Sequence, residues 1–179
     1  MNRLLLLALL FLSIGAQAQT TDFTEKECPS AKATLAIPKG WHFFELKNSD
    51  GGVSYLVTKE KVSSEYDSFN TGMTLNIIKS VEKTGMKASE HAKSLVDQSQ
   101  EKDEESKVET KEEAPFKVFK TTQTLDMDDG KLVMVTVFKA NDQTGTLYHF
   151  TGQYPQKEEA QALEIWNEIL KRTKLDPTY

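Results

Sequence analysis

The feature that most constrains the fold of this chain is a long apolar run at residues 131–140. In a β-strand, successive side chains point to opposite faces of the sheet. Apolar side chains fall on both faces here, with Leu132, Met134 and Phe138 on one and Val133, Val135 and Val137 on the other. A strand that is apolar on both faces has to be covered on both sides. We therefore predict a central strand with a further layer packed on each face of its sheet.

Other strands are expected on both sides of this one in the sequence, separated by turn residues. They fall at residues 32–37, 41–46, 53–58, 73–81, 116–125 and 146–154. Asp-Gly at residues 129–130 lies between two strand-like runs and is a strong hairpin signal. The turn at residues 48–52 joins two strands into a second hairpin over residues 41–59. Because tight hairpins join antiparallel neighbours, the sheet should be mainly antiparallel.

Two segments have the period of an amphipathic helix instead. In residues 88–100 the apolar positions recur at three- and four-residue spacing, and residues 157–174 carry a stronger stripe that includes Trp166. The second segment begins with acidic residues and ends with basic ones, which complements the helix dipole. The predicted fold class is therefore α+β, a mainly antiparallel sheet covered by two helices that need not share one face.

Residues 101–113 are mostly charged, and they allow two interpretations. Such a run can be an interaction or ion-binding segment. It can also be a solvated helix end followed by an edge strand, whose charges discourage pairing with other chains. We favour the edge strand.

The N-terminus has the pattern of a cleavable secretory signal over residues 1–18. Arg3 precedes a short leucine-rich stretch, and Ala16-Gln17-Ala18 supplies small residues at the cleavage site. The apolar run is shorter than the roughly 20 residues that a membrane-spanning helix needs. We expect export to a bacterial periplasm or the extracellular space, with no membrane span after cleavage. Residues 19–31 then form a flexible N-terminal segment, and residues 32–176 form a single domain.

The composition excludes several kinds of partner and chemistry. A net charge of −5 disfavours nucleic acid and anionic membranes as partners. Cys28 is the only cysteine, so an internal disulfide is excluded, while an intermolecular one stays open. The chain has no zinc-ligand spacing, hydrolase nucleophile elbow or phosphate-binding glycine loop. We therefore expect no catalytic residue, no cofactor and no metal. His42 and His149 are read as ordinary strand residues, the alternative being a metal-binding or proton-transfer pair.

Two short motifs resemble the PsbP/Mog1-like superfamily. Residues 35–41 read Leu-Ala-Ile-Pro-Lys-Gly-Trp, similar to an early entry motif of that family. Residues 147–152 read Leu-Tyr-His-Phe-Thr-Gly and precede the second predicted helix, like the family's final strand and helix. The resemblance covers roughly residues 32–174. It implies an α/β/α sandwich. The family is known mainly for binding and accessory roles, so the resemblance implies the fold far more than a particular function.

The leading functional hypothesis is an exported, non-catalytic accessory or protein-binding domain whose partner is another envelope protein. The alternative is an envelope hydrolase, or a carrier of a small ligand in an aromatic-lined groove. Residues that such a groove would use are Trp41, Phe43, Tyr55, Tyr148, His149 and Tyr154. Aromatic residues of this kind more often fill the space between a sheet and a helix, and that is the interpretation we favour.

Overall fold

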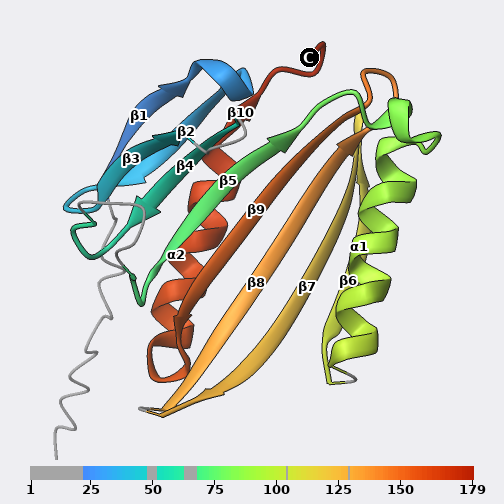
Figure 1. Ribbon diagram of the computed structural model, residues 1–179. Coiled ribbons are helices and arrows are strands. Elements are labelled where there is room, and N and C mark those ends of the chain that lie inside the picture. Colours follow the sequence, from blue (N-terminus) through green and yellow to red (C-terminus); the bar gives the residue numbers. More distant parts are fainter. Residues whose placement is uncertain (1–21, 48–51, 63–67, 104, 129) are drawn as a thin grey trace, which may run out of the picture.

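A computed structural model describes residues 22–47, 52–62, 68–103, 105–128 and 130–179 (Figure 1). The predicted signal peptide at residues 1–18 lies outside the described residues. The main sheet has seven antiparallel strands in the order β3-β4-β5-β9-β8-β7-β6. Their bounds, in that order, are His42–Lys47, Val53–Thr58, Gly72–Ile78, Thr146–Pro155, Gly130–Asn141, Phe116–Met127 and Lys107–Glu113.

A smaller sheet and two helices complete the layers. The small sheet has the order β1-β2-β10, formed by Phe23–Cys28, Ala33–Pro38 and Lys174–Leu175. Helix α1 (Ala88–Lys102) packs on one face of the main sheet, over β7 and β8. Helix α2 (Glu159–Arg172) lies on the other face, between the main sheet and β2 (Figure 1). Short 3-10 helices are η1 (Pro29–Ala31), η2 (Val81–Thr84) and η3 (Gln156–Glu158). The predicted α+β class, the mainly antiparallel sheet and the two helices are confirmed.

The two faces of β8 belong to two separate cores. Val133, Val135 and Val137 pack in the larger core with Trp166 and Ile169 of α2. Phe138 and Ala140 point the other way and pack under α1, with Ala92 and Val96. Buried apolar side chains on both faces of one strand hold a helix on each side of the sheet. The prediction that the two helices need not share a face is confirmed.

The prediction that β8 is fully covered on both faces is only partly right. Leu132 and Met134 share the α1 face with Phe138, yet they are half-buried rather than buried. Helix α1 packs on Phe138 and Ala140, at the other end of the strand. Hydrophobic periodicity shows that a face is apolar, but it does not show how far a covering helix extends along it.

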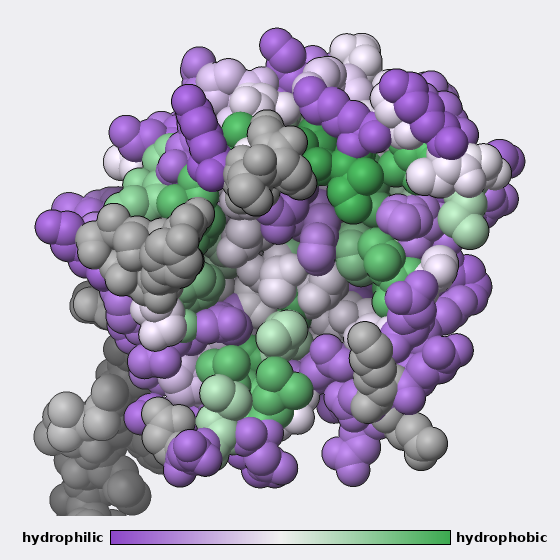
Figure 2. Space-filling model, viewed as in Figure 1, coloured by the Kyte–Doolittle hydropathy of each residue, from purple (hydrophilic) through white to green (hydrophobic). Residues whose placement is uncertain are grey.

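Threonines occupy the part of this face beside α1. Strand register places Thr74, Thr151, Thr136 and Thr121 side by side across β5, β9, β8 and β7. Three of the four are half-buried, and Thr121 is buried. Figure 2 shows this face with hydrophilic residues at its rim and a paler centre of intermediate hydropathy that is flanked by hydrophobic patches. Threonine suits such a surface, because its branched side chain fits a strand while its hydroxyl tolerates water.

The predicted flexible segment at residues 19–31 is corrected by the structure. Strand β1 pairs antiparallel with β2 from Phe23 opposite Pro38 to Cys28 opposite Ala33. Cys28 and Ala31 are fully buried and belong to the larger core. The four middle residues of β1 are exposed, so the segment lacks apolar alternation even though its backbone is hydrogen-bonded. Within the described residues, the globular fold therefore already includes β1 from Phe23, nine residues before position 32.

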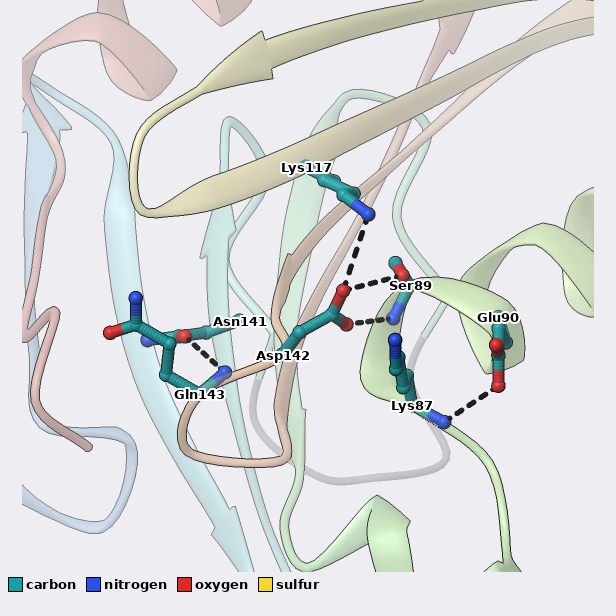
Figure 3. Close-up of polar contacts among 7 residues, drawn as sticks. All are labelled: Lys87, Ser89, Glu90, Lys117, Asn141, Asp142 and Gln143. Atoms are coloured by element: carbon teal, nitrogen blue, oxygen red, sulfur yellow. Dashed lines mark hydrogen bonds and ion pairs between the residues drawn. The ribbon is translucent and has the colours of Figure 1, made fainter.

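Helix α1 is capped by a residue that is remote in sequence. The carboxylate of Asp142 accepts hydrogen bonds from the backbone N–H and the hydroxyl of Ser89, both at 2.8 Å (Figure 3). Lys117 lies 3.3 Å from the same carboxylate, and Glu90 accepts a hydrogen bond from the N–H of Lys87 at 3.0 Å. Because Lys87, at the N-cap, has no acceptor oxygen in its side chain, Asp142 satisfies a helix donor that would otherwise lack a partner.

Replacement of Asp142 should therefore weaken the packing of α1. We expect Asp142→Ala to lower the free energy of unfolding by about 1–2 kcal/mol, the usual cost of losing a helix cap. Asp142→Asn keeps an acceptor for Ser89 and should cost less. Urea denaturation followed by circular dichroism measures both. Equal losses for the two variants would show that the negative charge, and not the capping acceptor, is what matters.

The contribution of Asp142 should also depend on pH. Burial alone would raise the pKa of this carboxyl, but the hydrogen bonds from Ser89 and the charge of Lys117 outweigh burial and hold it below its ordinary value. A carboxyl with a lowered pKa stabilises the fold above its unfolded pKa of about 3.9, and that contribution is lost as the pH falls through the folded pKa. The stability gap between wild type and Asp142→Asn should therefore shrink below about pH 4.

Candidate functional site

Five of the six residues of the predicted aromatic groove lie on the core side of the main sheet. Tyr55, Tyr148 and Tyr154 are at most 1% exposed, and Trp41 and Phe43 are half-buried against the same core. Phe43 stacks on Tyr55 with ring centroids 6.1 Å apart. These side chains fill the space between the sheet and its α2 layer, as the favoured interpretation expects. None of these five residues lines the groove described below.

His149, the sixth residue, lies on the opposite face of the sheet. Its ring stacks on Phe138 with centroids 4.6 Å apart and is 3.0 Å from the Thr151 hydroxyl. Burial holds the pKa of His149 below its ordinary value. His42 lies on β3, three strand positions from β9, a separation of about 14 Å at the usual strand spacing. The two histidines therefore do not form a pair that could share a proton or a metal.

A different surface forms a groove of about 640 Å³ on the α2 side of the sheet. Helix α2 packs on β2 and β9, and the groove lies between α2 and strands β6, β7 and β8. Valines 118 and 137 form an apolar floor, 3% exposed each. The other lining residues come from β6, β7, β8 and α2 and from the residue that follows α2. They are Glu109, Thr110, Lys111, Glu113, Lys120, Lys139, Asn167, Leu170, Lys171 and Thr173. We call this surface the lysine groove.

Strand register brings the charges of the lysine groove together. Glu109 lies opposite Lys120, which lies opposite Val137, and Lys111 lies opposite Val118, which lies opposite Lys139. Each row thus crosses β6, β7 and β8 and combines charged residues with one valine. The lysine side chains on the two inner strands are largely shielded, with Lys120 30% and Lys139 18% exposed. The side chains of Lys120 and Lys139 therefore lie beside the valines of the floor and are only partly open to solvent.

Two glutamates of the edge strand are the partners of these lysines. Glu109 lies 2.9 Å from Lys120, and Glu113 lies 2.9 Å from Lys139. Glu113 also pairs with Lys111, and the hydrogen bond from Lys111, with that from Lys139, holds the pKa of Glu113 below its ordinary value against the effect of burial. Three lysines therefore share two carboxylates. The groove carries a positive excess although the chain as a whole is acidic.

The sequence predicts the charged edge strand of this groove but not the lysines that lie beside it. Lys107, Glu109, Lys111 and Glu113 alternate in charge on one face of β6, which fits the predicted edge strand. Lys120 and Lys139 join them only through the pairing of β6 with β7 and of β7 with β8. Such register depends on contacts distant in sequence, so no local pattern identifies the site.

Cys28 is not a reactive group in the folded chain. Its side chain is fully buried, and burial raises the pKa of the thiol to about 12. We expect its reaction with Ellman's reagent at pH 8 to be at least ~1000-fold slower than in the unfolded chain, because thiolate is scarce and access is blocked. A Cys28→Ser variant with the exposed Gln161 changed to cysteine provides the matched control and should react at once. Rapid labelling of native Cys28 would contradict its burial.

Two features are absent from the part of the chain that the structure describes. No group of three or more histidine, cysteine, aspartate or glutamate side chains is placed to hold a metal ion among the described residues. Within the same residues, no helix has the length and apolar character needed to cross a membrane.

Comparison with known proteins supports the fold. No protein-family model and no curated protein sequence matches the chain. The solution structure of the cyanobacterial PsbP from Synechocystis sp. PCC 6803 matches with a TM-score of 0.57 and 10% identity, over 92% of this chain and 99% of that one. The Saccharomyces cerevisiae Ran-binding protein Mog1p matches with a TM-score of 0.52 and 12% identity, over 87% and 96%.

Two further bacterial structures match at the same level. LpqN of Mycobacterium tuberculosis, described as involved in cell envelope biogenesis, has a TM-score of 0.50 and 10% identity, over 88% of this chain and 92% of that one. A structure from Bacteroides thetaiotaomicron VPI-5482 has a TM-score of 0.52 and 12% identity over 85% of this chain, which spans only 48% of it. The chain therefore has a PsbP/Mog1-like fold, as the sequence motifs predict.

Proposed function

We propose that this chain is an exported, non-catalytic binding domain and that its partner is another protein of the bacterial cell envelope. The secretory pattern of residues 1–18 supports export. Among proteins of the same fold, Mog1p binds Ran, and LpqN is involved in cell envelope biogenesis. These neighbours are compatible with a binding role, but the location of the binding surface on this chain has to come from its own residues.

The observation that carries the proposal is the lysine groove. Its volume of about 640 Å³ lies within the range of roughly 300–1,000 Å³ that is typical of ligand sites. Its ionisable side chains are lysines and glutamates, with Lys120 and Lys139 each held by a carboxylate at 2.9 Å. Fixed ammonium groups over an apolar floor recognise charge and shape.

Site-specific cross-linking tests the proposal. A photo-reactive residue at Asn167, on the α2 wall of the groove, should join the chain to one envelope protein in living cells. The same residue at Gln161, an exposed position of the same helix, should not. The cross-linked protein, identified by mass spectrometry and purified, should bind the mature chain, and Lys120→Gln with Lys139→Gln should weaken that affinity at least tenfold. Equal cross-linking from both positions, or an unchanged affinity, would overturn the proposal.

Export is tested separately by the mass of the recovered protein. The chain expressed in a Gram-negative host should appear in the periplasmic fraction with Gln19 as its first residue. Recovery of the chain only in the cytoplasmic fraction, with its first residues still attached, would contradict export and leave the groove to be tested on its own.

A further inference from the structure

We propose that the lysine groove binds an extended acidic peptide segment, and that Glu109 and Glu113 of β6 occupy the positions that the ligand's carboxylates take. This inference rests on the proposed function and names the chemistry of the partner. It also assigns the two edge-strand glutamates a role as internal competitors for the site. The charge, the spacing and the floor of the groove each support it.

The charge of the groove is complementary to an acidic ligand. Four lysines line it, at positions 111, 120, 139 and 171, against the two glutamates. Lys171 has a further partner outside the groove, Glu168 at 3.0 Å. The remaining three lysines exceed their two carboxylate partners by one, so an incoming carboxylate meets a net positive site. Replacing the glutamates with neutral residues would increase that excess.

The spacing of the two shielded lysines suits an extended chain. Lys120 lies opposite Val137, and Lys139 follows Val137 by two residues on the adjacent strand. At one strand spacing across and two residues along, their Cα atoms lie about 8 Å apart. In an extended peptide, side chains at positions i and i+2 point to the same side at a separation of about 7 Å. Acidic residues at i and i+2 therefore match the two ammonium groups within the reach of a lysine side chain.

The floor and the size of the groove favour a peptide over a small anion. Val118 and Val137 form the base, but each is only 3% exposed, so the apolar surface that a ligand can reach is mainly the half-buried Leu170 at the α2 wall. Apolar side chains or the methylene groups of glutamates can pack against Leu170 while the carboxylates reach the lysines. An inorganic anion would occupy only a small part of a groove of about 640 Å³. The size of the groove and its apolar wall therefore favour a peptide.

Binding requires an exchange of partners at Lys120 and Lys139. Their present ion pairs are made by glutamates that extend from the sheet edge, and Glu109 is 67% exposed. The Glu109–Lys120 pair is open to solvent on its glutamate side, and ion pairs of that kind contribute little to stability. The Glu113–Lys139 pair is more shielded, with the two side chains 35% and 18% exposed, so Glu113 is the stronger competitor. A ligand carboxylate replaces Glu109 first, and the two glutamates weaken the affinity by competition without blocking the site.

Fluorescence anisotropy with labelled peptides tests the inference. The probe is an acetylated and amidated peptide of alternating glutamate and valine, six residues long. One control probe has glutamine in place of glutamate, and another has its three glutamates at positions 1, 2 and 5, so that no two of them are at i and i+2. The wild-type chain should bind the alternating acidic probe at least fivefold more tightly than either control. Glu109→Gln with Glu113→Gln should raise the affinity for it about tenfold.

Lysine variants give the opposite result and a matched control. When Lys120→Gln and Lys139→Gln are added to the double glutamate variant, its tenfold gain in affinity for the alternating acidic probe should disappear. Lys120→Arg with Lys139→Arg should leave binding of that probe intact. Lys59→Gln with Lys174→Gln removes two lysines that pair with exposed carboxylates elsewhere, and it should leave the affinity unchanged. Thermal melts establish that each variant is folded. Equal binding of the glutamine probe or of the probe with glutamates at positions 1, 2 and 5, stronger binding of tripolyphosphate, or no gain in the double glutamate variant would overturn the inference.

The two proposals can fail independently. If the envelope partner cross-links at Asn167 but the glutamate variants change neither its affinity nor that of the peptide, the acidic-segment inference fails and the protein-binding function stands. If the peptide binds as expected but no envelope protein cross-links at the groove, the proposed function fails and the peptide chemistry stands.

Discussion

Replacement of Val135 with aspartate is expected to unfold the domain. Val135 is fully buried in the middle of β8, opposite Gly152 of β9 and Thr122 of β7, and packs in the larger core. A carboxylate there has no cationic partner among the residues of that core, and an uncompensated buried charge costs at least several kcal/mol. The free energy of unfolding of a small domain is only about 5–15 kcal/mol, so the cost of this buried charge is comparable with the whole stability of the fold. The variant should lack a cooperative thermal transition.

Met134→Asp is the matched control for this experiment. Met134 is the neighbour of Val135 but points to the opposite, half-covered face of the sheet. A charge at that position can reach water, so we expect a cooperative transition with a loss of about 1–2 kcal/mol, within the range of ordinary destabilising substitutions. A melting temperature of Val135→Asp close to that of wild type would contradict the two-sided burial of β8. The same loss in both variants would show that the two faces are equally covered.

Local periodicity was enough to predict most of the elements. The hairpin of β7 and β8 follows from Asp-Gly between two strand patterns, but its register pairs Met127 with Gly130, so Gly130 is the first residue of β8 and not part of the loop. Helix α2 follows from its apolar stripe and its charged ends. The edge position of β6 follows from its charge, because an exposed, highly charged strand is a usual way to end a sheet. In each case a few neighbouring residues hold all of the information.

The parts that the sequence did not reveal depend on distant contacts. Strand β1 has four exposed residues in its centre, so its position is set by pairing with β2 and not by its own pattern. The aromatic residues form a core, which the sequence analysis favours, but the layers that cover them depend on how α2 and the small sheet stack on the main sheet. The lysine groove requires the register of three strands and the position of α2. None of these relations appears within a short window of residues.

Adding a single methyl group at Gly152 is expected to destabilise the domain by about 3 kcal/mol, at the upper end of what overpacking usually costs. Gly152 lies in β9, and the indole of Trp166, only 4% exposed, packs directly on its backbone. A Cβ atom at this position would lie 2.8 Å from Cζ2 of the indole and closer still to Cε2 and Nε1. Because the backbone at Gly152 does not have a positive φ, alanine is unstrained there and the cost is purely steric. Urea denaturation of Gly152→Ala measures it.

A double-mutant cycle with Trp166→Phe separates this contact from a general loss of packing. The smaller ring leaves space that the added methyl group fills, so the double variant should be at least 1 kcal/mol more stable than the sum of the two single losses, a coupling typical of residues in contact. Gly40→Ala is the control, since a Cβ there meets nothing within 4 Å and its φ of +84° makes the cost one of backbone strain. That cost should add to Trp166→Phe without coupling. Additive losses for Gly152 and Trp166 would mean that α2 does not rest on β9 through this contact, and the packing of the larger core would then need a different explanation.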